Sequence, residues 1–289
     1  MDANLKTDAA ANREYKDSVF SLLFNNADTL IEVYNAIAGT NYGPDADIKL
    51  TTLDYALYRG RINDLSFVLD GKLIVLIEHQ STINRNMPFR MLLYIADNLN
   101  RLTKNDDLYS KKMITIPRPE FFVLYNGVDE MPDGKIIFKL SDMFAKPDHA
   151  ADAAPDLELT VTMYNINKGR NIDIAKRSPT LDGYETFIHM IREFRKTMSL
   201  EEAIIKAVMD CINQNILKIF LENHKKEVVN MLTQEWCFET EMMVAKREAW
   251  EDGMYEAHRK NARAMKAKGI DLSTIVEITG LSVNDVLSL

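Results

Sequence analysis

The sequence predicts an α+β protein, an α/β sandwich of about 165 residues followed by a region built only of helices. The main observation is a change of period: helical spacing gives way to the alternation and solid apolar runs of strands, and from about residue 181 only the helical period remains. The second is composition. The chain of 289 residues is 46% hydrophobic and 27% charged, which allows a sizeable core.

The first predicted element is one helix over residues 15–37, where apolar side chains recur every three or four positions and Gly39 supplies the stop. The segments that follow have the period of strands, with one helix among them. Predicted strands cover residues 48–53, 65–69, 73–77, 121–125, 135–140 and 157–166, and the inserted helix covers residues 86–102.

The remainder of the chain is predicted to be helical. Residues 200–221 and 228–255 form long amphipathic patterns with few helix breakers. We therefore expect a sheet-containing domain over residues 1–168, a helical region over residues 169–240 and a helical tail over residues 241–289.

The hairpin around Asp70-Gly71 has two possible registers. A two-residue loop would pair Asp64 with Ile77 and point Glu78 to the other face. A three-residue loop pairs Leu65 with Ile77, which makes one face of the hairpin apolar and brings Asp64 opposite Glu78 on the other. Burial of an apolar face favours the three-residue loop, and Gly71 can adopt the left-handed conformation that such a loop needs.

Two carboxylates facing each other repel, so the three-residue register needs a compensating charge. Mg²⁺ supplies it, since it binds one or two carboxylates and takes its other ligands from water and phosphate. The backbone carbonyl of His79 is a further candidate ligand, and Gln80 projects to the same face as Glu78. The alternative, that Asp64 and Glu78 are solvated residues at strand ends, stays open.

Residues 63–95 carry the most specific pattern in the chain. It consists of Asn63-Asp64, Glu78-His79-Gln80-Ser81-Thr82, Asn84, Asn86-Met87-Pro88-Phe89-Arg90 and Tyr94. This block resembles the Rpn-type recombination-promoting nuclease and putative transposase family, which belongs to the PD-(D/E)XK nuclease superfamily. Weaker likeness extends over most of the chain.

The resemblance implies a nuclease core with a mixed central sheet, in which Asp64 and Glu78 bind Mg²⁺, with Mn²⁺ as a substitute. Such a site activates water to cut the phosphodiester bonds of DNA. Gln80 stands where the superfamily has a lysine, and a neutral amide can orient water but cannot stabilise negative charge. Lys16 or Arg90 could supply the positive charge that faces phosphate, although each could equally be a surface residue.

Two functions follow from these residues. The first is a Mg²⁺-dependent DNA endonuclease connected with recombination or mobile elements; the second is a nuclease-fold protein with little or no activity that acts as a binding module. The net charge of −8 excludes a protein coated with positive charge for nucleic acid, but it leaves room for a local basic groove.

Composition also bears on location and partners. Cys211 and Cys237 are too few for a disulfide framework, and the sequence pattern predicts neither a signal peptide nor a membrane-spanning run. We expect a cytoplasmic protein that binds no membrane. Basic residues between His258 and Lys268, followed by a pattern similar to a helix-turn-helix, favour a helical pair for packing, partner docking or homo-oligomerisation over one that reads DNA.

Overall fold

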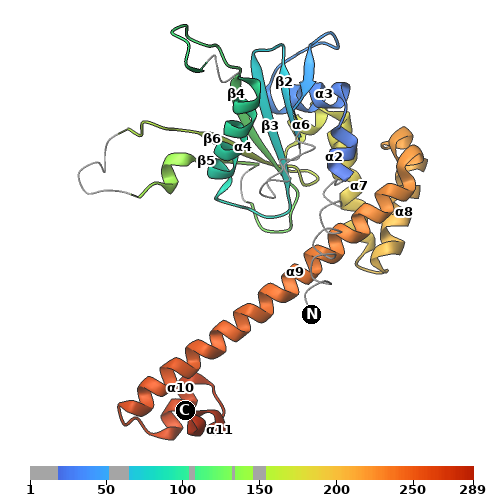
Figure 1. Cartoon of the computed structure of the whole chain (residues 1–289). Helices are drawn as coiled ribbons and strands as arrows, with labels where there is room; N and C mark the ends of the chain where they lie inside the picture. Colours follow the sequence, from blue (N-terminus) through green and yellow to red (C-terminus); the bar gives the residue numbers. More distant parts are fainter. Residues whose placement is uncertain (1–18, 52–64, 104–107, 132–133, 146–153) are drawn as a thin grey trace, which may run out of the picture. The chain divides into compact units, whose positions relative to one another are not determined.

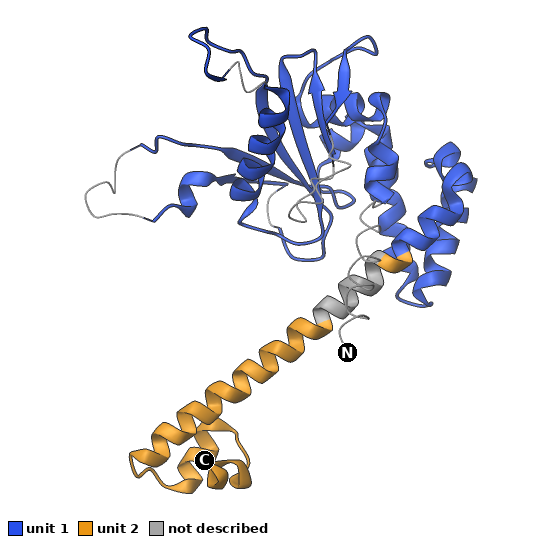
Figure 2. Cartoon of the chain, in the orientation of Figure 1, with its two compact units in different colours: residues 1–232 blue, residues 233–289 orange. Residues whose placement is uncertain are grey.

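The computed structural model describes residues 19–51, 65–103, 108–131, 134–145 and 154–289, and within the last range it does not describe the side chains of residues 235–243. The chain forms two compact units, residues 1–232 and 233–289 (Figure 2). A mixed sheet followed by helices confirms the predicted α+β class.

The first unit contains a six-stranded sheet in the order β1-β2-β3-β4-β6-β5 (Figure 1). Parallel pairing joins β3 to β4 and β4 to β6, and the other neighbours are antiparallel. The strands are β1 (Ile48–Leu50), β2 (Leu65–Leu69), β3 (Leu73–Gln80), β4 (Arg118–Tyr125), β5 (Lys135–Lys139) and β6 (Thr160–Asn165).

Helices surround and follow this sheet. Those of the first unit are α2 (Val19–Phe24), α3 (Ala27–Ala38), α4 (Met87–Leu102), the 3-10 helix η2 (Leu140–Met143), α6 (Ile172–Arg177), α7 (Pro179–Phe194) and α8 (Leu200–Asn213). α9 (Lys218–Ala267) runs from the first unit into the second, which also holds α10 (Leu272–Thr279) and α11 (Val283–Ser288).

Two helical predictions are wrong in detail. The predicted helix over residues 15–37 is broken at Asn26, the extended residue that caps the start of α3. Its side chain accepts a hydrogen bond from the Thr29 amide and so satisfies a donor of the first helical turn. The predicted helix over residues 200–221 ends at Asn213, and Asn215 and Leu217 take left-handed backbone conformations before α9 begins.

The β2–β3 hairpin has the predicted register. Leu69 pairs with Leu73, Phe67 with Val75 and Leu65 with Ile77, around a three-residue turn in which both Asp70 and Gly71 have positive φ. This choice decides the face on which every side chain of β3 lies, because a slip of one residue would invert them all.

Helices cover both faces of the sheet. On one face lies α4 (Figure 1). Its Met87, Met91 and Tyr94 pack against Leu76 and neighbouring apolar side chains. On the other face, rings from α2, α3 and α7 contact the sheet: Phe20 stacks on His79, Tyr34 meets Phe67 and Phe122, and Tyr184 meets His79. The carboxyl end of β3 therefore lies between two packed layers.

Candidate functional site

Glu78 is a buried carboxylate near the end of β3. Side chains alternate along the strand, so Leu76, Glu78 and Gln80 share the face that α4 covers. Glu78 is only 3% exposed. A charge so deeply buried needs a compensating cation.

Arg90 supplies a cation in this structure. Its Nη2 donates to Oε2 of Glu78 at 3.0 Å, and its side chain stays 36% exposed, so the guanidinium links the buried acid to solvent. The hydroxyl of Tyr94, one turn further along α4, accepts hydrogen bonds from Nη2 at 2.9 Å and from Nε at 3.3 Å.

Gln80 completes this group. With its amide oriented so that oxygen meets a donor and nitrogen an acceptor, it accepts from Nη1 of Arg90 at 2.8 Å and donates to the carbonyl of Thr82 at 3.3 Å. Arg90 thus holds Glu78 and Gln80 through different nitrogens. The sequence predicts Arg90 as a cation that faces phosphate and assigns no role to Tyr94. The position of Tyr94, four residues after Arg90 on a helix, is the signal for this contact.

The sequence of α4 explains why Arg90 reaches the strand. Pro88 lies in the first turn, where a missing amide costs nothing, and Met87, Met91, Tyr94 and Ile95 recur at helical spacing and are buried. Arg90 lies beside this apolar stripe, at the margin where an arginine stem can pack while its head remains partly in water.

The His79 side chain belongs to the opposite face. Its ring stacks on Phe20 with 4.7 Å between centroids, and Nε2 lies 3.2 Å from the Tyr184 hydroxyl. Burial, with the Arg192 charge as a smaller cause, lowers the pKa of His79 to about 4. The imidazole is therefore a neutral packing group at pH 7, and the backbone carbonyl of His79 as a metal ligand stays a prediction.

The turn after β4 holds the end of β3 in place. The amide of Asn126 donates to the carbonyl of Gln80 at 2.9 Å. A Cβ on Gly127 would come within 1.9 Å of the Ser81 carbonyl oxygen, so this close approach requires glycine. Arg192 of α7 donates to the carbonyl of Asn126 at 2.6 Å and to Oδ1 of Asn167 at 2.7 Å, a role that no local motif indicated.

Two predicted site residues, Lys16 and Asp64, lie outside the described residues. Asp64 directly precedes β2, and its place opposite Glu78 stays a prediction. Among the residues that the structure describes, no group of three or more histidine, cysteine or acidic side chains could hold a metal ion. The donor set of Glu78, Gln80 and a strand carbonyl fits Mg²⁺ in being all oxygen, and it depends on Asp64 for a second carboxylate.

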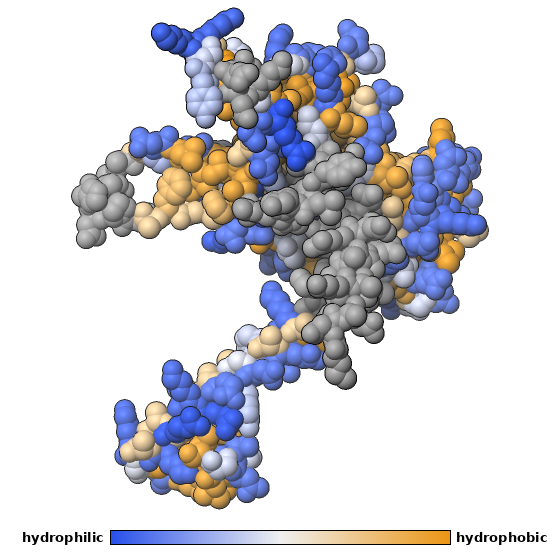
Figure 3. All heavy atoms as spheres, in the orientation of Figure 1, coloured by the Kyte–Doolittle hydropathy of each residue, from blue (hydrophilic) through white to orange (hydrophobic). Residues whose placement is uncertain are grey.

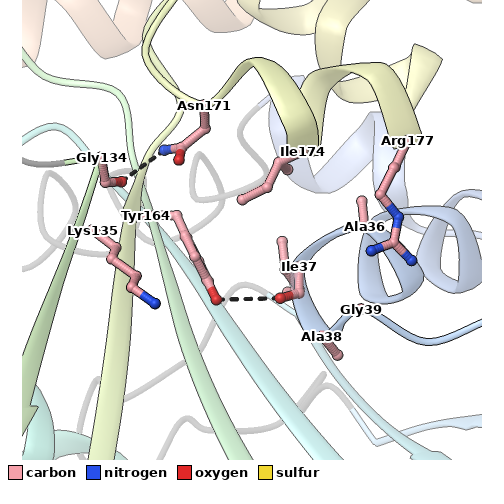
Figure 4. A pocket seen from close by; sticks show the side chains of 10 residues that line it. All are labelled: Ala36, Ile37, Ala38, Gly39, Gly134, Lys135, Tyr164, Asn171, Ile174 and Arg177. Atoms are coloured by element: carbon pink, nitrogen blue, oxygen red, sulfur yellow. Dashed lines mark hydrogen bonds between the residues drawn. The ribbon is translucent and has the colours of Figure 1, made fainter.

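A cavity of about 700 Å³ lies elsewhere, between the end of α3, α6 and the start of β5 (Figure 4). Its polar groups already serve the fold: the Tyr164 hydroxyl donates to the carbonyl of Ile37, Asn171 donates to that of Gly134, and Arg177 donates to that of Thr40. None of the proposed site residues that the structure describes, Glu78, His79, Gln80 and Arg90, lines it.

The helices at the end of the chain form a small packed cluster of their own. Ala262, Ile275, Leu281 and Val286 are buried together, and Lys266 donates to the carbonyls of Val286 and Leu287. The second short helix, α11, has only six residues. One basic side chain of the predicted stripe is thus committed to the fold.

The fold and the Glu78–Arg90 group define an α+β protein with an acidic residue held at a strand end of a mixed sheet. The model of the family described as "Putative transposase, YhgA-like" matches residues 61–218, more than half of the chain, and the protein belongs to that family. The family predicted from the block at residues 63–95 is confirmed.

Searches of curated proteins and of solved structures gave no match. Within the described ranges, none of the helices has the length and apolar character needed to cross a bilayer.

Proposed function

We propose that this member of the transposase-like family is a metal-dependent DNA endonuclease that hydrolyses phosphodiester bonds. The observation that supports it most is the placement of Glu78: a 3% exposed carboxylate on β3, beside Gln80 and Arg90, in the register that would carry Asp64 to its side. The family match supports a role at mobile elements or in recombination.

In this proposal Asp64 and Glu78 hold Mg²⁺ or Mn²⁺, with the backbone carbonyl of His79 as a further ligand. The bound cation would lower the pKa of a water molecule and shield charge on the phosphate. Gln80 orients that water or a phosphate oxygen through its amide. Water oxygen forms a new bond to phosphorus, the bond from phosphorus to one ester oxygen breaks, and that oxygen leaves with a proton.

In this proposal the Arg90 side chain takes one position without DNA and another when DNA is bound. Without DNA it neutralises Glu78 at 3.0 Å, and its partial exposure lets the guanidinium turn toward a phosphate when DNA arrives. Lys16 is the second candidate for a phosphate contact. Because the net charge of the chain is −8, we expect weak non-specific affinity for DNA and strong dependence on salt.

A cleavage assay tests the proposal. Supercoiled plasmid is incubated with Mg²⁺ and the full chain, beside Asp64→Ala and Glu78→Gln, with EDTA as a further control. We expect nicked or linear plasmid from the unsubstituted protein alone and none with EDTA. Equal cutting by all three proteins, or cutting by none, would refute the nuclease proposal.

The second candidate function is a binding module that keeps the fold without the chemistry. The Arg90–Glu78 pair favours it, because an arginine already compensates the charge for which a metal would be needed. Retained DNA binding by a protein that cuts nothing under Mg²⁺ or Mn²⁺ would select this alternative. A cytoplasmic location is part of both proposals.

A further inference from the structure

The middle of α9 is a helix exposed on all its sides. Every residue from 244 to 257 is exposed, and four of these have large apolar side chains: Val244 is 37% exposed, Trp250 65%, Met254 41% and Tyr255 44%. A single helix in water gains little stability from its own hydrogen bonds and is stabilised mainly by burying one face. Figure 3 shows apolar and hydrophilic residues side by side on this part of the molecule.

One face of this helix has the spacing of a coiled coil. Steps of four and three residues connect exposed positions along it, which is the 3.5-residue period that lets two helices stay in contact. The positions are Trp250, Met254, Ala257, Asn261, Ala264 and Lys268. We call this row the α9 seam.

Charge changes sign along the same helix. Between residues 248 and 256 the side chains include four acids, Glu248, Glu251, Asp252 and Glu256, and no base; between residues 259 and 268 they include five bases and no acid. Two of the acids make short-range pairs, Arg247 with Glu251 at 3.9 Å and Arg259 with Glu256 at 3.2 Å. Across the described part of the chain, Lys260, Arg263 and Lys268 form no ion pair.

This separation of acidic and basic segments favours a second copy of α9 as the partner that binds the α9 seam. A second α9 lying antiparallel places the acidic segment of each copy beside the basic segment of the other, whereas a parallel copy would place like charges together. The seam also places a large and a small side chain at equal distances from Ala257, since Trp250 lies seven residues before it and Ala264 lies seven residues after it. An antiparallel pair centred on Ala257 sets each tryptophan against an alanine.

We infer that the protein forms a homodimer through the α9 seam, with two antiparallel helices crossing at Ala257. In this arrangement Trp250 packs on Ala264 of the partner subunit, and Glu251 faces Arg263 of the partner subunit. The contact lies wholly within residues 247–268, inside the second compact unit, and does not depend on nuclease activity.

The mass of the full chain in solution is the first test. Sedimentation velocity should give about twice 33.1 kDa for the unsubstituted protein and a monomer for Trp250→Ala at the same micromolar concentration. Ile278→Ala removes another exposed apolar side chain of the same unit, 59% exposed on α10, and should remain dimeric. A monomeric unsubstituted protein, or a dimer that Trp250→Ala leaves intact, would overturn the inference.

Charge reversal tests the orientation. Glu251→Arg and Arg263→Glu should each weaken the dimer at least about tenfold, and the chain that carries both should recover most of the loss because the facing pairs are restored with opposite sign. Glu277→Arg, an exposed reversal on α10, is the matched control and should change little. Failure of the double substitution to recover affinity would refute the predicted pairing.

Cross-linking tests the centre of the pair. Ala257→Cys should form an intermolecular disulfide under mild oxidation, while Ala264→Cys should not, because in an antiparallel pair only the central position meets itself. Equal cross-linking at both positions would mean a parallel dimer and would overturn the inference.

Discussion

Arg90 and Glu78 form an ion pair that joins α4 to the end of β3, with 3.0 Å between Nη2 and Oε2. The Glu78 side chain is 4% exposed and the Arg90 side chain 36% exposed, so the carboxylate is buried while the guanidinium partly faces solvent. Any cation that binds Glu78 must share or replace this contact.

We predict that Arg90→Gln destabilises the protein more than loss of a surface ion pair does. Removing one partner of a buried pair costs about 3–5 kcal/mol. Because the Arg90 side chain is 36% exposed, we expect a smaller loss here, about 2–4 kcal/mol. Lys206→Gln is the matched control, because Lys206 and Asp210 have the same 3.0 Å separation on an exposed helix surface. Denaturant unfolding measures both, and equal losses would contradict the prediction.

Mg²⁺ should restore part of this loss. A divalent ion that binds the folded state at Glu78 stabilises it by mass action, and in Arg90→Gln the ion no longer competes with the guanidinium for the carboxylate. The midpoint temperature of thermal unfolding of Arg90→Gln should therefore rise more with added Mg²⁺ than that of the unsubstituted protein. An equal rise for both proteins would show that Arg90 and the metal do not compete.

Because His79 is buried as a neutral imidazole, we predict that the free energy of unfolding falls in acid. Its pKa falls from the ordinary 6.5 to about 4 in the folded protein, so the unfolded chain binds the proton more tightly. The stabilisation is complete above pH 6.5 and should decline by about 1–3 kcal/mol as the pH falls toward 4. Unfolding measured from pH 7 to pH 4 should show a weaker decline for His79→Phe, whereas the exposed His189→Gln should follow the unsubstituted protein.

Because the Glu185 carboxyl is buried, we predict that it makes the free energy of unfolding fall as the pH rises, the opposite of the effect of His79. It lies 2% exposed on α7, and burial raises the pKa of its carboxyl to about 8, with Lys168 opposing the rise. A raised pKa means that the folded state holds the proton, so stability is complete below about pH 4.5 and is lost as the pH rises to 8. Glu185→Gln should gain about 2–4 kcal/mol over the parent at pH 8 and almost nothing at pH 4.5. The same gain at both values would contradict this account.

Gly127→Ala should disturb the end of β3. Its new Cβ would lie 1.9 Å from the Ser81 carbonyl oxygen, a backbone atom that cannot rotate away. We expect the unfolding midpoint to fall by about 5–10 °C, in line with a loss of about 2–4 kcal/mol. Gly253→Ala is the control: nothing lies within 4 Å of its Cβ position, and alanine is the better helix former inside α9.

Local pattern predicted much of this fold because burial determined it. The hairpin register followed from the need to bury Phe67 and Ile77 on one face, and the structure has that register. The break at Asn26 was missed because the apolar spacing continues across it, and only the side-chain cap reveals it. The predicted helix over residues 200–221 is too long for a similar reason. The left-handed backbone conformation of Leu217 does not change the spacing of apolar residues, so the pattern continues past the true end of the helix.

The site was predictable only in part. Spacing on one strand placed Glu78 and Gln80 on a common face, because alternation is a local property. The contact of Glu78 with Arg90 depends on how α4 crosses the sheet. The hydrogen bond from Arg192 to the Asn126 carbonyl joins residues that lie 66 positions apart in the sequence. Such contacts depend on tertiary packing, which a single sequence does not disclose.

Binding of Mn²⁺ to the full chain tests the central claim most directly. Titration calorimetry or electron paramagnetic resonance should detect one site per chain in the unsubstituted protein, and both Asp64→Asn and Glu78→Gln should lose it while remaining folded by circular dichroism. Mn²⁺ bound equally by all three proteins, or by none of them, would show that these two carboxylates do not share a cation.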